Sequence, residues 1–160
     1  MSDFAVSWNL SRGRFVDALK DLRHDQLNWR MHPGTLTLAE AALHVAGVEV
    51  SFITQLLDLQ LDELGSRLKS AATEGVVNEA GFPFKVEEMT PEFVISCLEL
   101  SRGMVEPVIT APSDEVRGKT IKSALGPMID GTGALARLAF HAGYHQGQAH
   151  FLLTAPGFPK

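Results

Sequence analysis

The feature that most constrains the fold is a stretch of regularly spaced apolar residues between positions 38 and 59. Its apolar side chains recur every three or four residues, which is the period of a helix with one buried face. These positions are Leu38, Ala41, Val45, Val48, Phe52, Leu56 and Leu59. Thr37 and Glu40 have the spacing of a capping box, so the helix is expected to begin at Thr37. A helix of about six turns is long enough to form part of a helical bundle.

Three further stretches have the spacing of long helices. Residues 14–29 carry apolar side chains that are mostly three or four positions apart. Residues 90–109 open with Thr90 and Pro91, which is typical of a helix start because threonine caps the helix and proline's missing N–H costs nothing there. Residues 127–153 return to the helical period before a terminal turn rich in proline and glycine.

The stretches between these helices predict connections, and together they define the fold class. Residues 61–72 predict either a continuation of the preceding helix or a small separate one. Residues 74–89 and 110–127 contain glycine and proline without a clear period, so we expect long connections, with a short extended piece at residues 116–121. Four long helices without alternating strand patterns predict an all-α four-helix bundle, in a single domain spanning residues 1–160.

Composition narrows the class of protein. Hydrophobic residues make up 45% and charged residues 21% of the chain, as in ordinary globular proteins. No apolar run reaches the roughly eighteen residues of a membrane-spanning helix, and no secretion signal is recognisable, so we expect a cytoplasmic protein without a membrane partner. The net charge of −5 has no basic cluster within it, which argues against nucleic acid as a partner. The single cysteine, Cys97, suits a reducing compartment and is expected to be buried and unreactive.

The histidines are the residues that point to chemistry. Three of the six lie in the segment HAGYHQGQAH, residues 141–150, and the first two fall on the apolar stripe of the last helix. His141 and His145 are therefore about 6 Å apart along the helix axis and share one face, so both imidazoles can reach a single ion. The spacing alone leaves a second interpretation, in which inward histidines hydrogen-bond to each other or to water. Gly143 and Gly147 suggest close packing or space for a ligand nearby.

A third candidate ligand comes from the second long helix. His44 lies between Ala41 and Val48 and borders the buried stripe. Three neutral imidazoles around a divalent ion, with a fourth position open, are typical of a catalytic metal site. The other three histidines are expected to take no part, because they lie near a helix end, in a turn and on another face of the last helix. They are His24, His32 and His150.

Better-known metal motifs do not match. The segment HAGYH lacks the glutamate of the HExxH proteases, and the HxxEH order is absent as well. A di-iron bundle needs Glu-x-x-His motifs, whereas Glu40 and His44 are four apart and the last helix has no acid after Asp130. Glu40 is better explained as the capping-box residue.

Two segments carry a resemblance to a known family. LNWRMHPGTLTLAEAALHVAGVE, residues 27–49, and HAGYHQGQAHFLLTAPGFP, residues 141–159, resemble the two signature segments of the DinB/YfiT-like superfamily of four-helix bundles. In that family one histidine comes from the second helix and two from the last, followed by Gly-Gln and a Gly-x-Pro turn. The matching residues are His44, His141, His145, Gly147, Gln148, Gly157 and Pro159.

The resemblance implies a divalent metal site formed by His44, His141 and His145, with zinc or nickel as the metal. One departure concerns Gln146, because many members carry an arginine there; any anion contact made by that arginine is in doubt in this chain. Tyr144 and Gln148 are nearby candidates for other roles, with Tyr144 expected to face a neighbouring helix.

The resemblance also implies an activity, although it defines the reaction less closely than the metal site. Characterised relatives include metal-dependent transferases and isomerases that use a low-molecular-weight thiol such as bacillithiol, mycothiol or glutathione. We therefore expect a homodimeric metal-dependent enzyme that activates such a thiol for S-transfer to, or isomerisation of, a small electrophilic substrate. The alternative is a non-catalytic metal- or ligand-binding stress-response protein.

Overall fold

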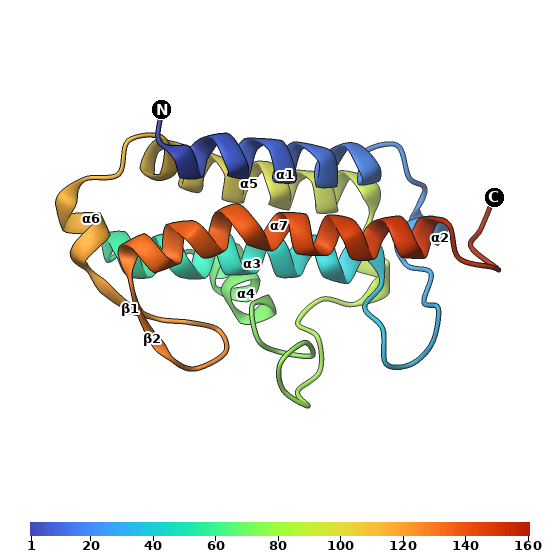
Figure 1. Ribbon diagram of the computed structural model, residues 1–160. Coiled ribbons are helices and arrows are strands. Elements are labelled where there is room, and N and C mark those ends of the chain that lie inside the picture. The colour runs from blue at the N-terminus through green and yellow to red at the C-terminus, as the bar shows by residue number, and fades with distance from the viewer.

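The computed structural model describes residues 1–160 and contains four long helices arranged as a bundle (Figure 1). They are α1 Asp3–Leu19, α3 Leu38–Leu57, α5 Pro91–Thr110 and α7 Gly131–Leu153. Helices α1 and α5 form one layer and α3 and α7 the other, and each helix packs against two of the others. Helices α1 and α7 run in one direction and α3 and α5 in the opposite one (Figure 1). The predicted all-α four-helix bundle is confirmed.

The remaining elements are short and lie in the connections. They are α2 His24–Leu27, α4 Glu63–Ala71, the 3-10 helix η1 Val86–Glu88, α6 Asp114–Gly118, β1 Thr120–Lys122 and β2 Met128–Asp130. Strands β1 and β2 form an antiparallel hairpin in which Ile121 lies opposite Ile129. Because α3 and α5 run the same way, the chain between them must return along the bundle, and α4 lies in that crossover (Figure 1).

Helix α3 is the central element, with 18 of its 20 residues buried. The predicted capping box starts it: the Thr37 hydroxyl accepts a hydrogen bond from the Glu40 amide at 3.1 Å, and the Thr37 amide donates to the Glu40 carboxylate at 2.8 Å. Helices α4, α5 and α7 all pack on α3. Apolar as α3 is, neither it nor any other helix has the length and hydropathy needed to cross a bilayer.

The prediction for the first helix was wrong in its bounds. Helix α1 begins after Ser2, whose hydroxyl accepts a hydrogen bond from the Ala5 amide at 3.2 Å, and ends at Leu19 instead of continuing to residue 29. Its buried positions are spaced three, four, three and four apart. They are Ala5, Trp8, Arg12, Phe15 and Leu19. A charged residue in the third of these positions hides the period, because Arg12 is buried where an apolar side chain is expected.

Arg12 is buried because it has buried partners. Its Nε lies 2.9 Å from the Glu49 carboxylate of α3, which also accepts hydrogen bonds from the Trp8 indole at 2.9 Å and from the Ser101 hydroxyl of α5. The guanidinium also donates to the backbone carbonyl of Leu98. This network joins three of the four long helices and pairs both charges.

The connection before α7 also differs from the prediction. Residues 116–121 were expected to be extended, but the first part belongs to α6 and only Thr120 onward is a strand. Helix α7 starts at Gly131, after the hairpin, with the Asp130 side chain accepting from the Gly133 amide at 2.7 Å. A Cβ on Gly131 would lie 1.7 Å from the Val116 carbonyl oxygen, so only glycine permits this close approach of α6.

The single thiol matches its prediction. Cys97 lies on α5, fully buried in the core. Burial raises the pKa of the Cys97 thiol to about 11, and the neighbouring Ser96 hydroxyl only partly opposes this shift. The thiolate that would react with an oxidant or a metal is therefore disfavoured.

Candidate metal centre

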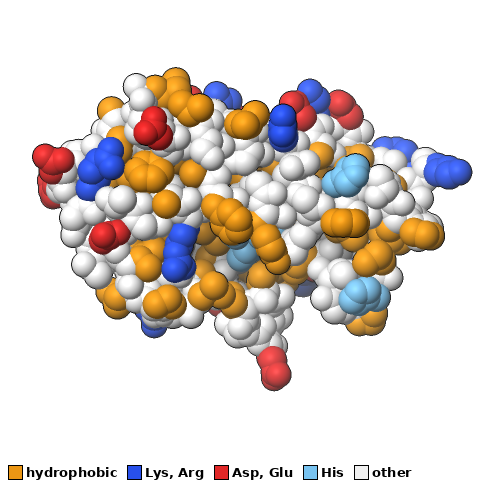
Figure 2. Space-filling view, viewed as in Figure 1, with side chains coloured by type: hydrophobic (Ala, Val, Ile, Leu, Met, Phe, Trp, Pro, Cys, Tyr) orange, Lys and Arg blue, Asp and Glu red, His pale blue; other side chains and the backbone are white.

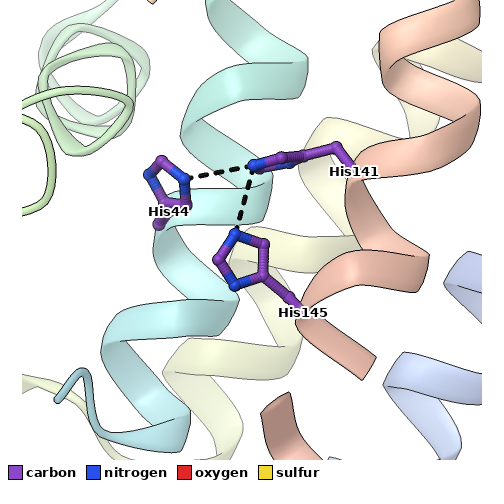
Figure 3. A group of neighbouring side chains, drawn as sticks. All are labelled: His44, His141 and His145. Carbon is purple, nitrogen blue, oxygen red and sulfur yellow. Dashed lines mark hydrogen bonds between the residues drawn. The ribbon is translucent and has the colours of Figure 1, made fainter. Parts of the chain in front are cut away.

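Three histidine side chains from two helices point at one another inside the bundle (Figure 3). The Nε2 atom of His141 lies 3.2 Å from Nε2 of His44 and 3.1 Å from Nε2 of His145. The ligand atoms of all three lie within 4.8 Å of one another. The structure thus brings together the three residues that the sequence singled out.

The two histidines of α7 meet because of the helical period. His141 and His145 stand one turn apart on the inward stripe, and this stripe is buried on both sides of them. Its buried apolar members are Ala134, Leu138, Ala149 and Leu152. Within this stripe His145 is 3% exposed and His141 is half-buried, so the pair opens toward solvent on one side only.

A hydrogen bond on its far side orients the His44 ring. Nδ1 of His44 lies 2.9 Å from the carbonyl oxygen of Ala71, the last residue of α4. Since a carbonyl only accepts, Nδ1 must carry the proton, and the lone pair of Nε2 faces the other two histidines. Metal-bound histidines in proteins have this arrangement, with the second nitrogen bonded to a carbonyl or carboxylate.

Helix α4 reaches His44 because α3 has a glycine at the crossing point. A Cβ on Gly47 would lie 2.3 Å from the Leu68 carbonyl oxygen and 2.8 Å from the Ala72 amide nitrogen. Any other residue would push α4 outward, and the Ala71 carbonyl would move with it. Gly47 therefore supports the site indirectly, because it allows α4 to lie close enough for the Ala71 carbonyl to reach His44.

Burial keeps all three imidazoles neutral. It lowers the pKa of His141 to about 2, with repulsion from His145 and His44 adding to the effect. Burial also lowers the pKa of His145 to about 3, reinforced by His44 and partly opposed by the Gln148 side chain. The pKa of His44 is lowered by burial as well, against the effect of its bond to Ala71. Neutral imidazole is the form that binds metal ions.

The donor set fits a divalent ion of the zinc type. Three nitrogens, each about 2.1 Å from one tetrahedral ion, are about 3.4 Å apart from each other, and two of the three separations here are 3.1 and 3.2 Å. Nε2 of His44 has no proton to share, and a single proton on His141 cannot satisfy every lone pair in the cluster. A divalent cation held by His44, His141 and His145 would satisfy the lone pairs of all three.

Gln148 is a polar side chain on α7 that affects the pKa of His145. Nδ1 of His145 is buried and makes no hydrogen bond within ordinary geometry, while the amide of Gln148, one turn further along α7, acts on the pKa of that ring. Unlike His44, whose Nδ1 is bonded to the Ala71 carbonyl, His145 has no bonded partner at its second nitrogen. Gln148 also lines the opening of the site.

The histidines lie at the inner wall of a groove of about 1160 Å³. Its lining is mainly hydrophobic, with aromatic side chains from α3 and α7 such as Phe52, Phe140 and Phe151. The space-filling view shows a histidine between hydrophobic side chains near the middle of this face (Figure 2). A groove of this size and character is typical of a site for a small organic molecule.

Apart from the histidines, only three residues with carboxylate or basic side chains line the groove. They are Arg30, Glu40 and Arg137. Glu40 is engaged in the capping box and in an ion pair with Arg30. Sequence reasoning missed Arg137, although it stands one helical turn before His141 and so shares the face of the two histidines.

The other residues considered from the sequence lie as follows. Tyr144 does not face a neighbouring helix as predicted: it is 52% exposed, lines the groove, and its ring stands 5.1 Å from that of His145.

The two glycines of this segment differ in their surroundings. Gly143 permits close packing, since a Cβ there would lie 3.2 Å from Cβ of Ser11 on α1, whereas Gly147 faces open space outside the groove lining. Gln146 is half-buried and does not line the groove.

The three histidines predicted to stand apart do so. His24, His32 and His150 are all exposed. His24 begins α2 instead of lying at the end of the first helix, and its Nε2 is 3.0 Å from the Val86 carbonyl oxygen. None of the three approaches the cluster.

The comparisons with known proteins identify the family. The family model of the DinB superfamily matches residues 7–149, and the chain therefore belongs to that superfamily of helical-bundle proteins. A crystal structure described as that of the conserved protein of locus from Enterococcus faecalis is similar to it with a TM-score of 0.68. The two share 15% sequence identity over 93% of this chain and 92% of that one, which supports the shared fold. No curated protein matches the chain.

Proposed function

We propose that this protein is a metal-dependent enzyme whose metal is held by His44, His141 and His145. The observation that carries the proposal is the convergence of three neutral imidazole Nε2 atoms at the wall of an open, mainly apolar groove. When bound there, zinc or nickel would supply Lewis-acid chemistry and lower the pKa of a thiol or water at its open position. We take the substrate to be a small electrophile and the cosubstrate to be a low-molecular-weight thiol.

The groove favours thiol chemistry because it offers no free carboxylate to serve as a general base. Its one carboxylate, Glu40, is occupied by Arg30 and by the helix start. A thiol has an ordinary pKa near 8.5, so it needs much less help than water to lose its proton. The mainly apolar lining offers few groups that bind water near the reacting atoms, and Tyr144 and Gln148 provide polar groups within it.

The metal site is tested by metal content. Protein purified without chelator is analysed by inductively coupled plasma mass spectrometry, alongside His141→Ala and the control His150→Ala, an exposed histidine on the same helix. We expect about one zinc or nickel per chain in the wild type and His150→Ala, and a loss in His141→Ala. Equal metal content in all three proteins would contradict the proposed ligands.

The activity is tested separately. Metal-loaded protein is mixed with 1-chloro-2,4-dinitrobenzene and bacillithiol, mycothiol or glutathione, and conjugation is followed by absorbance. We expect acceleration with one of the thiols that disappears in His141→Ala. Retained metal without acceleration by any thiol or isomerisation of a substrate would favour the alternative, a non-catalytic metal- or ligand-binding protein.

We further propose that two copies of the chain associate. Large apolar side chains remain exposed on the neighbouring helices α1 and α7, among them Leu10 at 57%, Phe140 at 66% and Phe151 at 74%. Covering them in a homodimer would remove this area from water. Light scattering after size-exclusion chromatography measures the mass, and a 17.4 kDa species at all concentrations would contradict the dimer.

A further inference from the structure

We propose that the groove selects small molecules that carry an anionic group on an apolar body, and that Arg137 binds the anionic group. The inference names the ligand class of the site and so rests on the proposed function. It starts from a difference between the two arginines that line the groove, Arg30 and Arg137.

Arg30 already has its anion. Its guanidinium is paired with the Glu40 carboxylate and also donates to the backbone carbonyl of Thr35. Arg137 has none, because no ion pair in the protein includes it. Its one hydrogen-bond partner is neutral, the Ser123 hydroxyl, which accepts from one terminal nitrogen at 2.7 Å. The remaining guanidinium N–H groups are free to bind an anion.

The side chain of Arg137 is restrained by its surroundings. The side chain is half-buried on α7, and its bond to Ser123 ties it to the β1–β2 loop. An arginine fixed in this way loses less side-chain entropy when it binds, and its planar fork matches the oxygens of a carboxylate, sulfonate or phosphate. Ser123 itself is 4% exposed, so the anchor of the guanidinium is shielded from water.

The charges that line the groove favour binding of an anion, although the net charge of the whole protein is negative. The chain carries a net charge of −5, yet the groove lining has two arginines and a single glutamate. With the Arg30–Glu40 pair neutralised, the positive charge of Arg137 has no counterion within the lining. Apolar walls around it strengthen its attraction for an anion relative to open water.

The rest of the groove defines the body of the ligand. Arg137 stands one turn before His141 on α7, which places their backbone positions about 6 Å apart along the helix. A small molecule can therefore set its anionic group on Arg137 while another part reaches the histidines. Phe52, Phe140 and Leu125 line the same groove and offer apolar and aromatic surface to the body of that molecule.

A matched pair of fluorescent probes tests this inference. 8-Anilinonaphthalene-1-sulfonate and N-phenyl-1-naphthylamine share an apolar body and differ in the sulfonate group. Each is titrated into the full chain, both after chelator treatment and after zinc loading, with metal content measured in parallel. We expect the wild type to bind the sulfonate with a dissociation constant about tenfold lower than that of the neutral probe.

Four variants make the result specific. Arg137→Gln should lose the preference for the sulfonate while binding the neutral probe as the wild type does, and Arg137→Lys should keep part of it. Arg14→Gln, which removes an exposed arginine of α1, controls for the change in net charge and should behave as wild type. Ser123→Ala breaks the tie to the β1–β2 loop but keeps the cation, and should retain most of the preference.

The outcomes separate this inference from the proposed function. An unchanged probe ratio in Arg137→Gln overturns the inference, and so does a loss in Ser123→Ala as large as that in Arg137→Gln, because the loop would then be responsible. An Arg137-dependent preference in the chelator-treated protein supports it whether or not metal is retained. Absence of metal from the wild type would instead overturn the proposed metal site alone.

Discussion

At the scale of single residues, the candidate metal centre depends on atoms that do not bind the metal. Nδ1 of His44 is fixed by a backbone carbonyl, and the Gln148 side chain raises the pKa of the His145 ring. Such partners orient the ring and raise its basicity, and losing one typically weakens metal binding by about 10-fold to 100-fold. Two glutamines on α7 allow this support to be tested.

We expect Gln148→Ala to weaken zinc affinity by about tenfold, because the Gln148 amide raises the pKa, and so the basicity, of the His145 ring. Competition against a chromophoric chelator measures the dissociation constant. Gln146→Ala is the matched control, since Gln146 lies two residues away and outside the groove lining. Equal losses of affinity in both variants would show that the amide of Gln148 has no specific role.

The buried pair of Arg12 and Glu49 supports the fold at the same scale. Removing one partner leaves a buried charge without compensation, so we expect Arg12→Leu to lower the free energy of unfolding by about 3–5 kcal/mol. The double variant Arg12→Leu, Glu49→Gln should recover part of this loss, because the uncompensated carboxylate is gone. Urea unfolding measures all three proteins, and a double variant less stable than Arg12→Leu would contradict this explanation.

At the scale of elements, the site is built by α3 and α7 and supported by α4. The short helix α4 lies in the crossover between α3 and α5 and delivers the Ala71 carbonyl to His44. Its distance from α3 is set by Gly47, where even a Cβ would lie 2.3 Å from a backbone oxygen of α4. The position of α4 thus controls the orientation of a ligand that belongs to another helix.

We expect Gly47→Ala to lower the free energy of unfolding by about 1–3 kcal/mol and also to weaken zinc affinity, because α4 must move away from His44. Gly147→Ala is the matched control on α7, with no atom within 4 Å of the added Cβ. It should stabilise the protein by about 0.5–1 kcal/mol through better helix propensity. Wild-type zinc affinity in Gly47→Ala would rule out this role of α4.

The sequence was informative wherever a local pattern decides the structure. The capping box of Thr37, the threonine-proline start of α5 and the spacing of His141 and His145 each act within one or two helical turns, and all three were predicted. Helix α1 was predicted poorly because Arg12 occupies a core position, which makes sense only once Glu49 packs against it. The extended piece predicted at residues 116–121 overlaps β1 only at its end, and β2 was missed, because three-residue strands are too short for a readable period.

The candidate site was predictable in its histidines and not in its surroundings. His44 and the α7 pair follow from helical faces and from the family resemblance. The carbonyl that orients His44, and the exposure of Tyr144 at the rim, depend on how distant segments pack. Arg137 lacks an anion only because no acidic residue of another element packs beside it, a fact that no local pattern contains.

At the scale of the whole molecule, three inward-facing neutral histidines make the stability of the metal-free protein depend on pH. The pKa values of His141 and His145 are lowered to about 2 and 3, and that of His44 is lowered too, whereas an unfolded histidine titrates near 6.5. Below pH 6.5 these histidines therefore bind protons in the unfolded state but stay neutral in the folded state. The stability present above pH 6.5 is lost progressively as the pH falls toward 3.

We expect the free energy of unfolding of the chelator-treated protein to fall between pH 6.5 and 5, by up to about 1.4 kcal/mol per pH unit for each histidine that stays neutral. Urea unfolding at several pH values measures the slope. His141→Gln should give a shallower slope, with His150→Gln as the exposed control on the same helix. A slope that His141→Gln leaves unchanged would mean that the buried cluster does not cause it.

The separation of the ligands along the chain has a mechanical consequence. His44 and His141 are 97 residues apart, so an ion held between them closes a long loop of the chain, as a disulfide would. With one cysteine the chain has no internal disulfide, and this would be its only cross-link. Such a cross-link opens when the ion leaves, and its strength follows the free metal concentration. The lifetime of the protein against proteases would then report the metal supply around it.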